Sequence, residues 1–282
     1  MSLSDVERTS PGYTTVVHAI ITGGSSGIGL EVARQLMERG ASVSLIARDR
    51  DRLEQACTDL AAGLSEKRKR IFTATADVTD RAVLAAAISA AEQRFGACDI
   101  LVVSAGRVDP AMFDDQLPEL FDAQVNLNFI GAVNAARLVY RGMKTRKRGK
   151  IVFVSSGAAA IGIPGYTAYC ASKIALKGFV ESLHAEARPF GVLISVAYPP
   201  DTHTPQYVEE MLHRPAQAKK IMGTVAPWTP HRVADKIVRA LDRGTKEVHF
   251  GFALTMLALF GAFVKPVVYW LASRGQWLRR HD

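Results

Sequence analysis

The chain contains little of the chemistry that disulfide-linked or metal-dependent proteins use. Its 282 residues include only three cysteines, Cys57, Cys98 and Cys170, and no C-x-x-C pair. An odd number of scattered thiols argues against a disulfide framework and favours a reducing compartment. None of the seven histidines has a metal-ligand spacing such as H-E-x-x-H, so we expect no metal site. The polar stretch Met1–Pro11 also lacks the apolar segment of a signal peptide.

Internal repeats and low-complexity linkers are lacking too, which favours one large domain with a sizeable core. Lysine and arginine outnumber the acidic residues by 35 to 27, a net charge of +8. A basic chain suits anionic ligands such as phosphates, nucleic acid or an acidic membrane surface. The basic run Lys144–Lys150 lies between a predicted helix and a predicted strand and has no interleaved aromatic residue. We expect a solvated loop there and no nucleic-acid partner.

Short apolar strands alternate with helices through residues 1–249. The strands are predicted at 16–21, 42–47, 71–76, 100–104, 150–155, 192–198 and 247–250. Helices are predicted at about 30–39, after the glycine-rich stretch 23–29, and at 51–62, 81–95, 118–141, 168–189 and 230–243. This alternation predicts an α/β, Rossmann-type doubly wound parallel sheet with helices on both faces. We expect a single domain over 1–249, followed by an apolar C-terminal segment over 250–282.

A glycine-rich loop connects the first predicted strand to the first predicted helix. Glycines allow a tight turn and a close approach of backbone to ligand, and the helix N-terminus attracts a pyrophosphate. A string of this kind in this position predicts dinucleotide binding. The expected contacts are Thr22, Gly23, Ser25, Ser26, Gly27, Ile28 and Gly29.

The end of the second strand indicates which dinucleotide binds. Sites for NAD usually place an acid there to bind the ribose 2′-hydroxyl. Here Ala47 has no carboxylate, and the next residue, Arg48, can neutralise a 2′-phosphate, which favours NADPH. Alternatively Asp49 supplies the acid and Arg48 is only solvated, although Asp49 is better placed as the N-cap of the next helix.

Tyr169 and Lys173 are four residues apart, so a helix would point the phenol and the ammonium into the same space. A nearby positive charge lowers the pKa of a phenol toward the range of an acid-base catalyst. Ser156 ends the apolar run before them. The pattern therefore suggests a proton-transfer site, although an ordinary surface pair has the same spacing.

Together these motifs resemble the short-chain dehydrogenase/reductase family over about residues 16–241. The matching residues are Thr22, Gly23, Gly27 and Gly29, then Asp77-Val78, then Asn128 and Gly131, then Ser156, and last Tyr169 and Lys173. The family motif N-N-A-G reads Val103-Ser104-Ala105-Gly106 here, which leaves some hydrogen bonds of the sheet in doubt.

The resemblance implies a role for each matching residue. Tyr169 would protonate the substrate oxygen, Ser156 would donate a hydrogen bond to it, and Lys173 would lower the Tyr169 pKa and hold the nicotinamide ribose. Asn128 would hold a water molecule that relays protons to Lys173. Further contacts to the cofactor, NADPH or NADP, would come from Asp77 at the adenine, Val78, Ala105, Gly106, Pro199 and Thr202.

The segment Tyr198-Pro199-Pro200-Asp201-Thr202 is similar to that of family members that reduce the C3 ketone of a long-chain keto sphingoid base. The expected activity is therefore this NADPH-dependent reduction in sphingolipid synthesis. The alternatives are reduction of a steroid, retinoid or 3-oxoacyl ketone, or a non-catalytic NADP-binding scaffold. The family resemblance also implies a homo-oligomer, a dimer or a tetramer.

The C-terminal segment begins with fifteen uncharged residues, 250–264, and continues after Lys265-Pro266. Fifteen helical residues reach about 22 Å, less than the ~30 Å hydrocarbon core of a bilayer. The whole stretch to Ala272 could span a bilayer only with Lys265 and a proline kink inside it, so we expect an in-plane or re-entrant amphipathic segment on the cytoplasmic face of a membrane. In a eukaryote this would be the endoplasmic reticulum. The alternative is a lid over the substrate pocket or a helix in a dimer interface.

Overall fold

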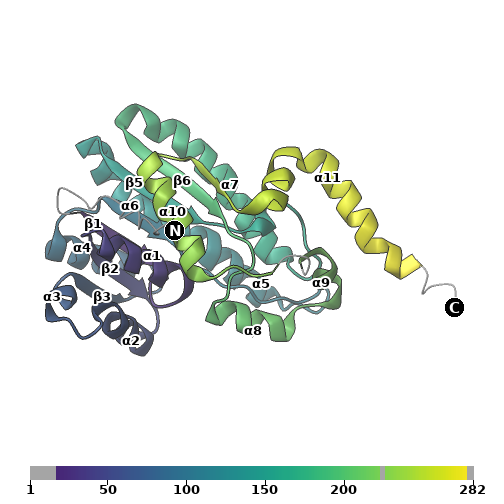
Figure 1. Ribbon diagram of the computed structural model, residues 1–282, viewed down its shortest axis with the longest axis horizontal. Coiled ribbons are helices and arrows are strands. Elements are labelled where there is room, and N and C mark those ends of the chain that lie inside the picture. Colours follow the sequence, from purple (N-terminus) through teal and green to yellow (C-terminus); the bar gives the residue numbers. More distant parts are fainter. Residues whose placement is uncertain (1–16, 223–225, 278–282) are drawn as a thin grey trace, which may run out of the picture.

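The computed structural model describes residues 17–222 and 226–277, and in them seven strands form one parallel sheet (Figure 1). The strand order is β3-β2-β1-β4-β5-β6-β7. The strands are β1 (His18–Thr22), β2 (Ser42–Ala47), β3 (Ile71–Thr75), β4 (Ile100–Val103), β5 (Gly149–Val154), β6 (Val192–Tyr198) and β7 (Glu247–His249). The predicted doubly wound sheet is confirmed, with most strand ends within two residues of those expected.

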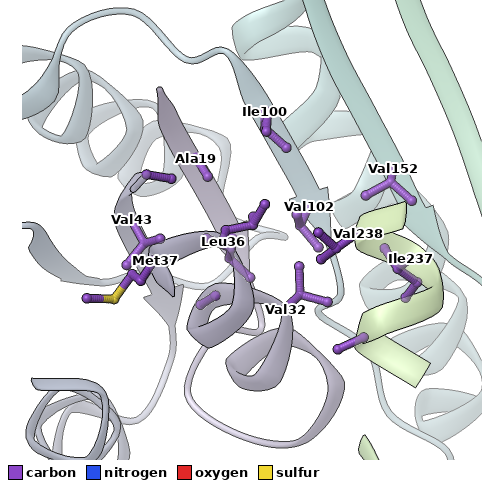
Figure 2. Close-up of a cluster of buried hydrophobic side chains, with 14 of the residues drawn as sticks. Ala19, Val32, Leu36, Met37, Val43, Ile100, Val102, Val152, Ile237 and Val238 are labelled. Carbon is purple, nitrogen blue, oxygen red and sulfur yellow. The ribbon is translucent and has the colours of Figure 1, made fainter. Parts of the chain in front are cut away.

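Helices cover both faces of the sheet, as the apolar strand sequences require. One face carries α1 (Gly27–Glu38), α2 (Arg50–Ala61) and α10 (Pro230–Arg243). The other carries α4 (Arg81–Phe95), α6 (Gly131–Arg146) and α7 (Thr167–Ala187). Figure 2 shows the first interface, where Val32 and Leu36 of α1 point toward Val102 and toward Ile237 of α10. This packing fixes the strand ends that carry the site.

The helix predicted at 118–141 proves to be three segments. It consists of α5 (Pro118–Val125), a π-helical turn η1 (Asn126–Ile130) and α6, which continues to Arg146. Gly131 at the end of the turn packs so closely on Val78 that a Cβ would lie 2.4 Å from the valine side chain. The longer α6 also moves the first residues of the basic run, Lys144 to Arg146, from the expected loop into a helix.

Several short helices were not predicted because they lack an extended apolar period. They are α3 (Ser65–Arg68), α8 (Pro205–His213) and α9 (Ala216–Met222), with two 3-10 turns, η2 (Gly157–Ala159) and η3 (Arg188–Phe190). Thr204 caps α8 by accepting a hydrogen bond from the Tyr207 amide, and Pro205 occupies the first turn. With α9, this helix builds one wall of the cleft described below.

The C-terminal segment is one bent helix, α11 (Gly251–Trp277), whose second part extends away from the body of the protein (Figure 1). The interruption lies at Phe260 (φ −117°, ψ 23°), directly before Gly261, and not at the expected Pro266. Glycine has a low helix propensity, which fits an interruption directly before Gly261, whereas Pro266 lies inside the second part of the helix without breaking it. Over Gly251–Leu271 the helix is long and apolar enough to cross a membrane.

Candidate active site

A cleft of about 590 Å³ lies at the carboxyl ends of the strands, where the order reverses between β1 and β4. Most of the residues predicted for the site line it. They are Gly23, Ser25, Ser26, Gly27, Ile28, Arg48, Val78, Ala105, Gly106, Ser156, Tyr169, Lys173, Pro199 and Thr202. Four others, Thr22, Gly29, Asp77 and Asn128, lie behind this lining.

The glycine-rich loop has the form that a pyrophosphate needs. Gly23 has φ +70°, and a Cβ there would lie 2.6 Å from the backbone nitrogen of Ala105. Gly29 packs as tightly in α1, where a Cβ would lie 2.4 Å from the Gly23 carbonyl oxygen. Ser26 precedes α1 without forming a side-chain cap, and no acid lies in the first turn. The free N–H groups and partial positive charge of this helix end therefore face the cleft and fit a dinucleotide.

Charged side chains surround the end of β2. Arg48 lies 3.6 Å from a carboxylate oxygen of Asp77, and its side chain remains 58% exposed. Asp49 caps α2 by accepting a hydrogen bond from the Arg52 amide, as the sequence predicted. Arg52 also lines the cleft and was not predicted as a site residue. Two guanidinium groups thus face the region where a cofactor ribose would lie.

Asn128 fixes the loop after β4 from the π turn. Its amide group donates to the Arg107 carbonyl (2.9 Å) and to the Ser172 hydroxyl (3.2 Å), and its oxygen accepts from the Arg107 amide (2.9 Å). The side chain is 1% exposed. These bonds hold the Ala105–Gly106 backbone beside the cleft. The predicted contact of Asn128 with a relay water stays a prediction.

Tyr169 and Ser156 come together from α7 and from the end of β5. Ser156 begins the η2 turn and accepts a hydrogen bond from the Ala158 amide (3.1 Å). Burial raises the pKa of Tyr169 above its usual value, while its hydrogen bond with Ser156 lowers it and the charges of Glu210 and Asp201 raise it. The direction is opposite to the one expected from Lys173, because burial outweighs the other effects. A raised pKa keeps the phenol protonated at neutral pH, which is the form of a proton donor.

Lys173 extends beneath Tyr169 from the same face of α7. Its Nζ donates to the Val154 carbonyl (3.1 Å) and lies 5.5 Å from the centre of the Tyr169 ring. The residue is 5% exposed, and burial lowers its pKa to about 8. A Cβ on Gly106 would lie 3.5 Å from Nζ, so the glycine keeps space beside the ammonium. Lys173 is therefore placed as a buried cation next to the phenol.

A buried charged network that the sequence did not reveal closes the other end of the cleft. Arg214 donates to Asp201 (2.7 Å), to Glu210 (2.6 Å) and to the Tyr166 hydroxyl (3.2 Å). Tyr166 donates in turn to Glu210 (2.7 Å), and its ring meets that of Tyr169 edge to face. Burial raises the pKa of Glu210, while its bonds with Tyr166 and Arg214 lower it. The only sequence signal was the spacing of Glu210 and Arg214, which is equally common in exposed helix pairs.

Comparison with known proteins assigns the class. The family model described as short chain dehydrogenase matches residues 17–213, and the chain belongs to this family of oxidoreductases. It is 35% identical to the 3-ketodihydrosphingosine reductase of Bos taurus over 89% of this chain and 76% of that protein. The 3-dehydrosphinganine reductase of Danio rerio is 36% identical, with the same shares covered.

Among solved structures, the chain is similar to actinorhodin polyketide ketoreductase with NADPH. The TM-score is 0.76 at 24% identity, over 86% of this chain and 98% of that chain. This likeness supports the fold.

Burial of the Lys173 ammonium should lower the stability of the folded protein, although the proposed reaction needs this charge. Its pKa is about 8 in the folded protein, and about 10.4 in an unfolded chain. Below pH 8 the folded state carries the full cost of burying the charge, and this cost falls as the pH rises to about 10.4. We expect Lys173→Met to be more stable by about 1–3 kcal/mol at pH 7, with the gain shrinking toward pH 10, in urea unfolding without cofactor.

Lys177→Met is the matched control for that measurement. Lys177 lies one turn further along α7, with its side chain 39% exposed and 4.0 Å from Glu181. Its stability should stay within about 0.5 kcal/mol of the wild type at both pH values. A Lys173→Met protein less stable than the wild type at pH 7 would contradict the buried-charge interpretation.

Proposed function

We propose that the protein uses NADPH to reduce the C3 ketone of 3-ketodihydrosphingosine to dihydrosphingosine. The observation that carries the chemistry is the meeting of Ser156, Tyr169 and Lys173 at one end of a cleft whose other end fits a dinucleotide. Relatives that are named for this reaction support the substrate. The structure adds apolar side chains in the cleft wall, Val108 and Met222, that an alkyl chain would contact.

In this reaction, Tyr169 donates its phenolic proton to the ketone oxygen. Ser156 donates a hydrogen bond to the same oxygen and stabilises the charge that develops there. Lys173 places a positive charge below the phenol, so that the phenolate left after proton transfer is stabilised. A bound nicotinamide cofactor supplies the hydride that the carbonyl carbon accepts. The loop held by Asn128 would form the floor beneath the reacting groups.

Members of the short-chain dehydrogenase family bind a nicotinamide cofactor, and the charges around β2 favour NADPH over NADH. The Arg48 and Arg52 guanidinium groups can form charge-assisted hydrogen bonds to a 2′-phosphate. Asp77, the acid near Arg48, already accepts two bonds from Thr79 and pairs with Arg48. It is therefore poorly placed to select a 2′-hydroxyl.

An apolar cluster next to the cleft supports a lipid substrate. It includes Val108 and Tyr166 of the cleft wall, with Ala158, Ile161, Ile163, Cys170 and Ala218. Met222 of the cleft wall packs against it, as do Leu257 and Val268 of α11. Val108 and Met222 give the cleft wall an apolar side that an alkyl chain would contact, and the packed cluster behind them joins this wall to the C-terminal helix.

The C-terminal helix supports contact with the cytoplasmic face of a membrane, at the endoplasmic reticulum if the source is a eukaryote. Large apolar side chains are exposed along the whole of α11, on both sides of the interruption at Phe260. They include Phe252 (80% exposed), Leu259, Phe260, Phe263 (80% exposed), Val267, Trp270 and Leu271. Because these residues are not confined to one face of the helix, they suit insertion of α11 into the apolar part of a membrane. We keep 1–249 and 250–282 as separate functional units, and we propose a dimer or tetramer from the family alone.

Tyr169→Phe tests the proton donor. Removing the hydroxyl should lower kcat for 3-ketodihydrosphingosine by about 10³-fold, within the range for loss of a general acid. The dissociation constant for NADPH should change by less than about threefold, since the phenol is not expected to bind the phosphates. The matched control is Tyr140→Phe on α6, which should retain activity. Substantial ketone reduction by Tyr169→Phe would remove Tyr169 from the mechanism.

The same assay with steroid, retinoid and 3-oxoacyl ketones tests the substrate. A higher kcat/KM for one of those ketones would replace the sphingoid base in the proposal. If the protein reduced neither 3-ketodihydrosphingosine nor any of these other ketones, it would be a binding protein and not an enzyme.

Arg48→Ala tests the cofactor. Loss of the guanidinium should lower kcat/KM for NADPH by about 30-fold, and that for NADH by less than about threefold, because only NADPH carries the 2′-phosphate. Arg50→Ala removes the same group from an exposed residue paired with Glu54 and should leave both values near those of the wild type. If kcat/KM fell equally with NADPH and with NADH, Arg48 would not bind the 2′-phosphate.

Replacing Phe252 and Phe263 with serine tests the membrane contact. Each phenylalanine contributes about 2 kcal/mol when buried, so the double variant should sediment with anionic vesicles at least tenfold more weakly. The control pair, Val208→Ser and Leu212→Ser, changes exposed apolar residues of α8 and should sediment as the wild type does. Unchanged binding by the α11 variant would favour the lid or dimer alternative.

A further inference from the structure

The buried network beside Tyr169 holds more negative than positive charge. Asp201 and Glu210 contribute two carboxylates and Arg214 contributes one guanidinium, so the network has one negative charge in excess. The Arg214 side chain is 2% exposed, that of Glu210 is 10% exposed and that of Asp201 is 18% exposed. An uncompensated buried charge is costly. A network of this kind next to a reaction site therefore suits a ligand that brings a positive charge.

The two ends of the cleft differ in charge. At the cofactor end, Arg48 and Arg52 are balanced by Asp77 and Asp49, and the N-terminus of α1 adds partial positive charge. Lys173 lies between the ends, with its Nζ bonded to Val154 and close to Gly106. The Asp201–Glu210 end is thus the part of the cleft that attracts a cation.

Glu210 has the geometry of a ligand-binding carboxylate. Its Oε1 accepts both hydrogen bonds, from the Tyr166 hydroxyl and from Arg214, so Oε2 remains for a ligand. Tyr166 lies one turn before Tyr169, with the two ring centres 6.3 Å apart. Both Glu210 and Asp201 are close enough to act electrostatically on the Tyr169 hydroxyl. A group attached next to the reacting carbonyl would lie within the field of these two acids.

We propose that Glu210, held in place by Arg214 and Tyr166, and assisted by Asp201, binds a protonated amino group on the carbon next to the ketone. The protein would then select α-amino ketones over neutral ketones. This inference rests on the proposed function, whose substrate carries such an amino group. A neutral ketone leaves the excess charge of the network unpaired, which gives the selection its physical basis.

The test compares 3-ketodihydrosphingosine with an analogue of the same chain length that has hydrogen in place of the amino group. The wild type should prefer the amino ketone by at least about tenfold in kcat/KM, the scale of one charge-assisted contact. Glu210→Gln should reduce that preference to about twofold, mainly by raising KM for the amino ketone. Glu186→Gln removes the same charge from an exposed residue of α7 that does not line the cleft, and should keep the preference.

The outcomes separate this inference from the proposed function. Equal kcat/KM for the two ketones with the wild type would overturn amino-group recognition and leave the reductase proposal standing. If Glu210→Gln lowered kcat/KM equally for both ketones, the role of Glu210 would be purely structural, and amino-group recognition would again be overturned. No reduction of the amino ketone by the wild type would overturn the proposed function itself. The wild-type comparison decides the matter even if Glu210→Gln does not fold.

Discussion

The parallel direction of all seven strands is the constraint on which the site depends. Because the strands run the same way, the loops after β1, β2, β4, β5 and β6 all emerge at one edge of the sheet. The order reverses between β1 and β4, so those loops diverge and leave a cleft between them. The cleft exists only while the apolar strands stay covered on both faces. Helices α1 and α10 cover one face (Figure 2), and α6 and α7 cover the other. The scaffold thus determines where a dinucleotide and a ketone can meet, and the side chains at the edge determine what happens to them.

Close backbone contacts make that edge precise. Gly23 and Gly29 let the first loop pass against Ala105 and fold back on itself, and larger residues would collide with backbone atoms. Asn128 holds Arg107 by two hydrogen bonds, which supplies part of the pairing that the unusual Val103-Ser104 sequence does not guarantee. Asn128 lies within the π turn between α5 and α6. The wider turn changes the direction of its side chains, and the Asn128 side chain therefore reaches the loop after β4. These contacts fix the positions of backbone atoms at the cleft and bury little apolar surface. Their main effect is therefore on function, and their effect on stability is smaller.

Sequence reasoning predicted the elements with strong local patterns and missed those defined by tertiary contacts. β2, α4, β6 and α10 begin and end where their apolar periods and caps indicated. The π turn at Asn126–Ile130 has no distinctive composition, and α8 and α9, with 9 and 7 residues, are too short for an apolar period to mark them. Most residues in the family motifs lie on the cleft because motif and strand end coincide. Arg52, Glu210 and Arg214 were missed since their importance comes from which elements the fold brings together, and i, i+4 charge pairs occur on many exposed helices.

The two halves of the proposed lipid substrate make different demands on the protein. A polar head with a ketone and an ammonium needs fixed charges, and the cleft provides Tyr169 and Ser156 beside the Asp201–Glu210 carboxylates. An alkyl chain needs apolar contacts, and Val108 and Met222 supply them in the cleft wall. The buried cluster around Ile161 and Ile163 packs these wall residues against Leu257 and Val268 of α11, so the cleft and the helix are parts of one packed unit. The exposed apolar residues of α11 are suited to the acyl region of a membrane. A membrane contact through α11 would therefore hold the cleft near the bilayer, so that a substrate of very low solubility would travel only a short distance through water.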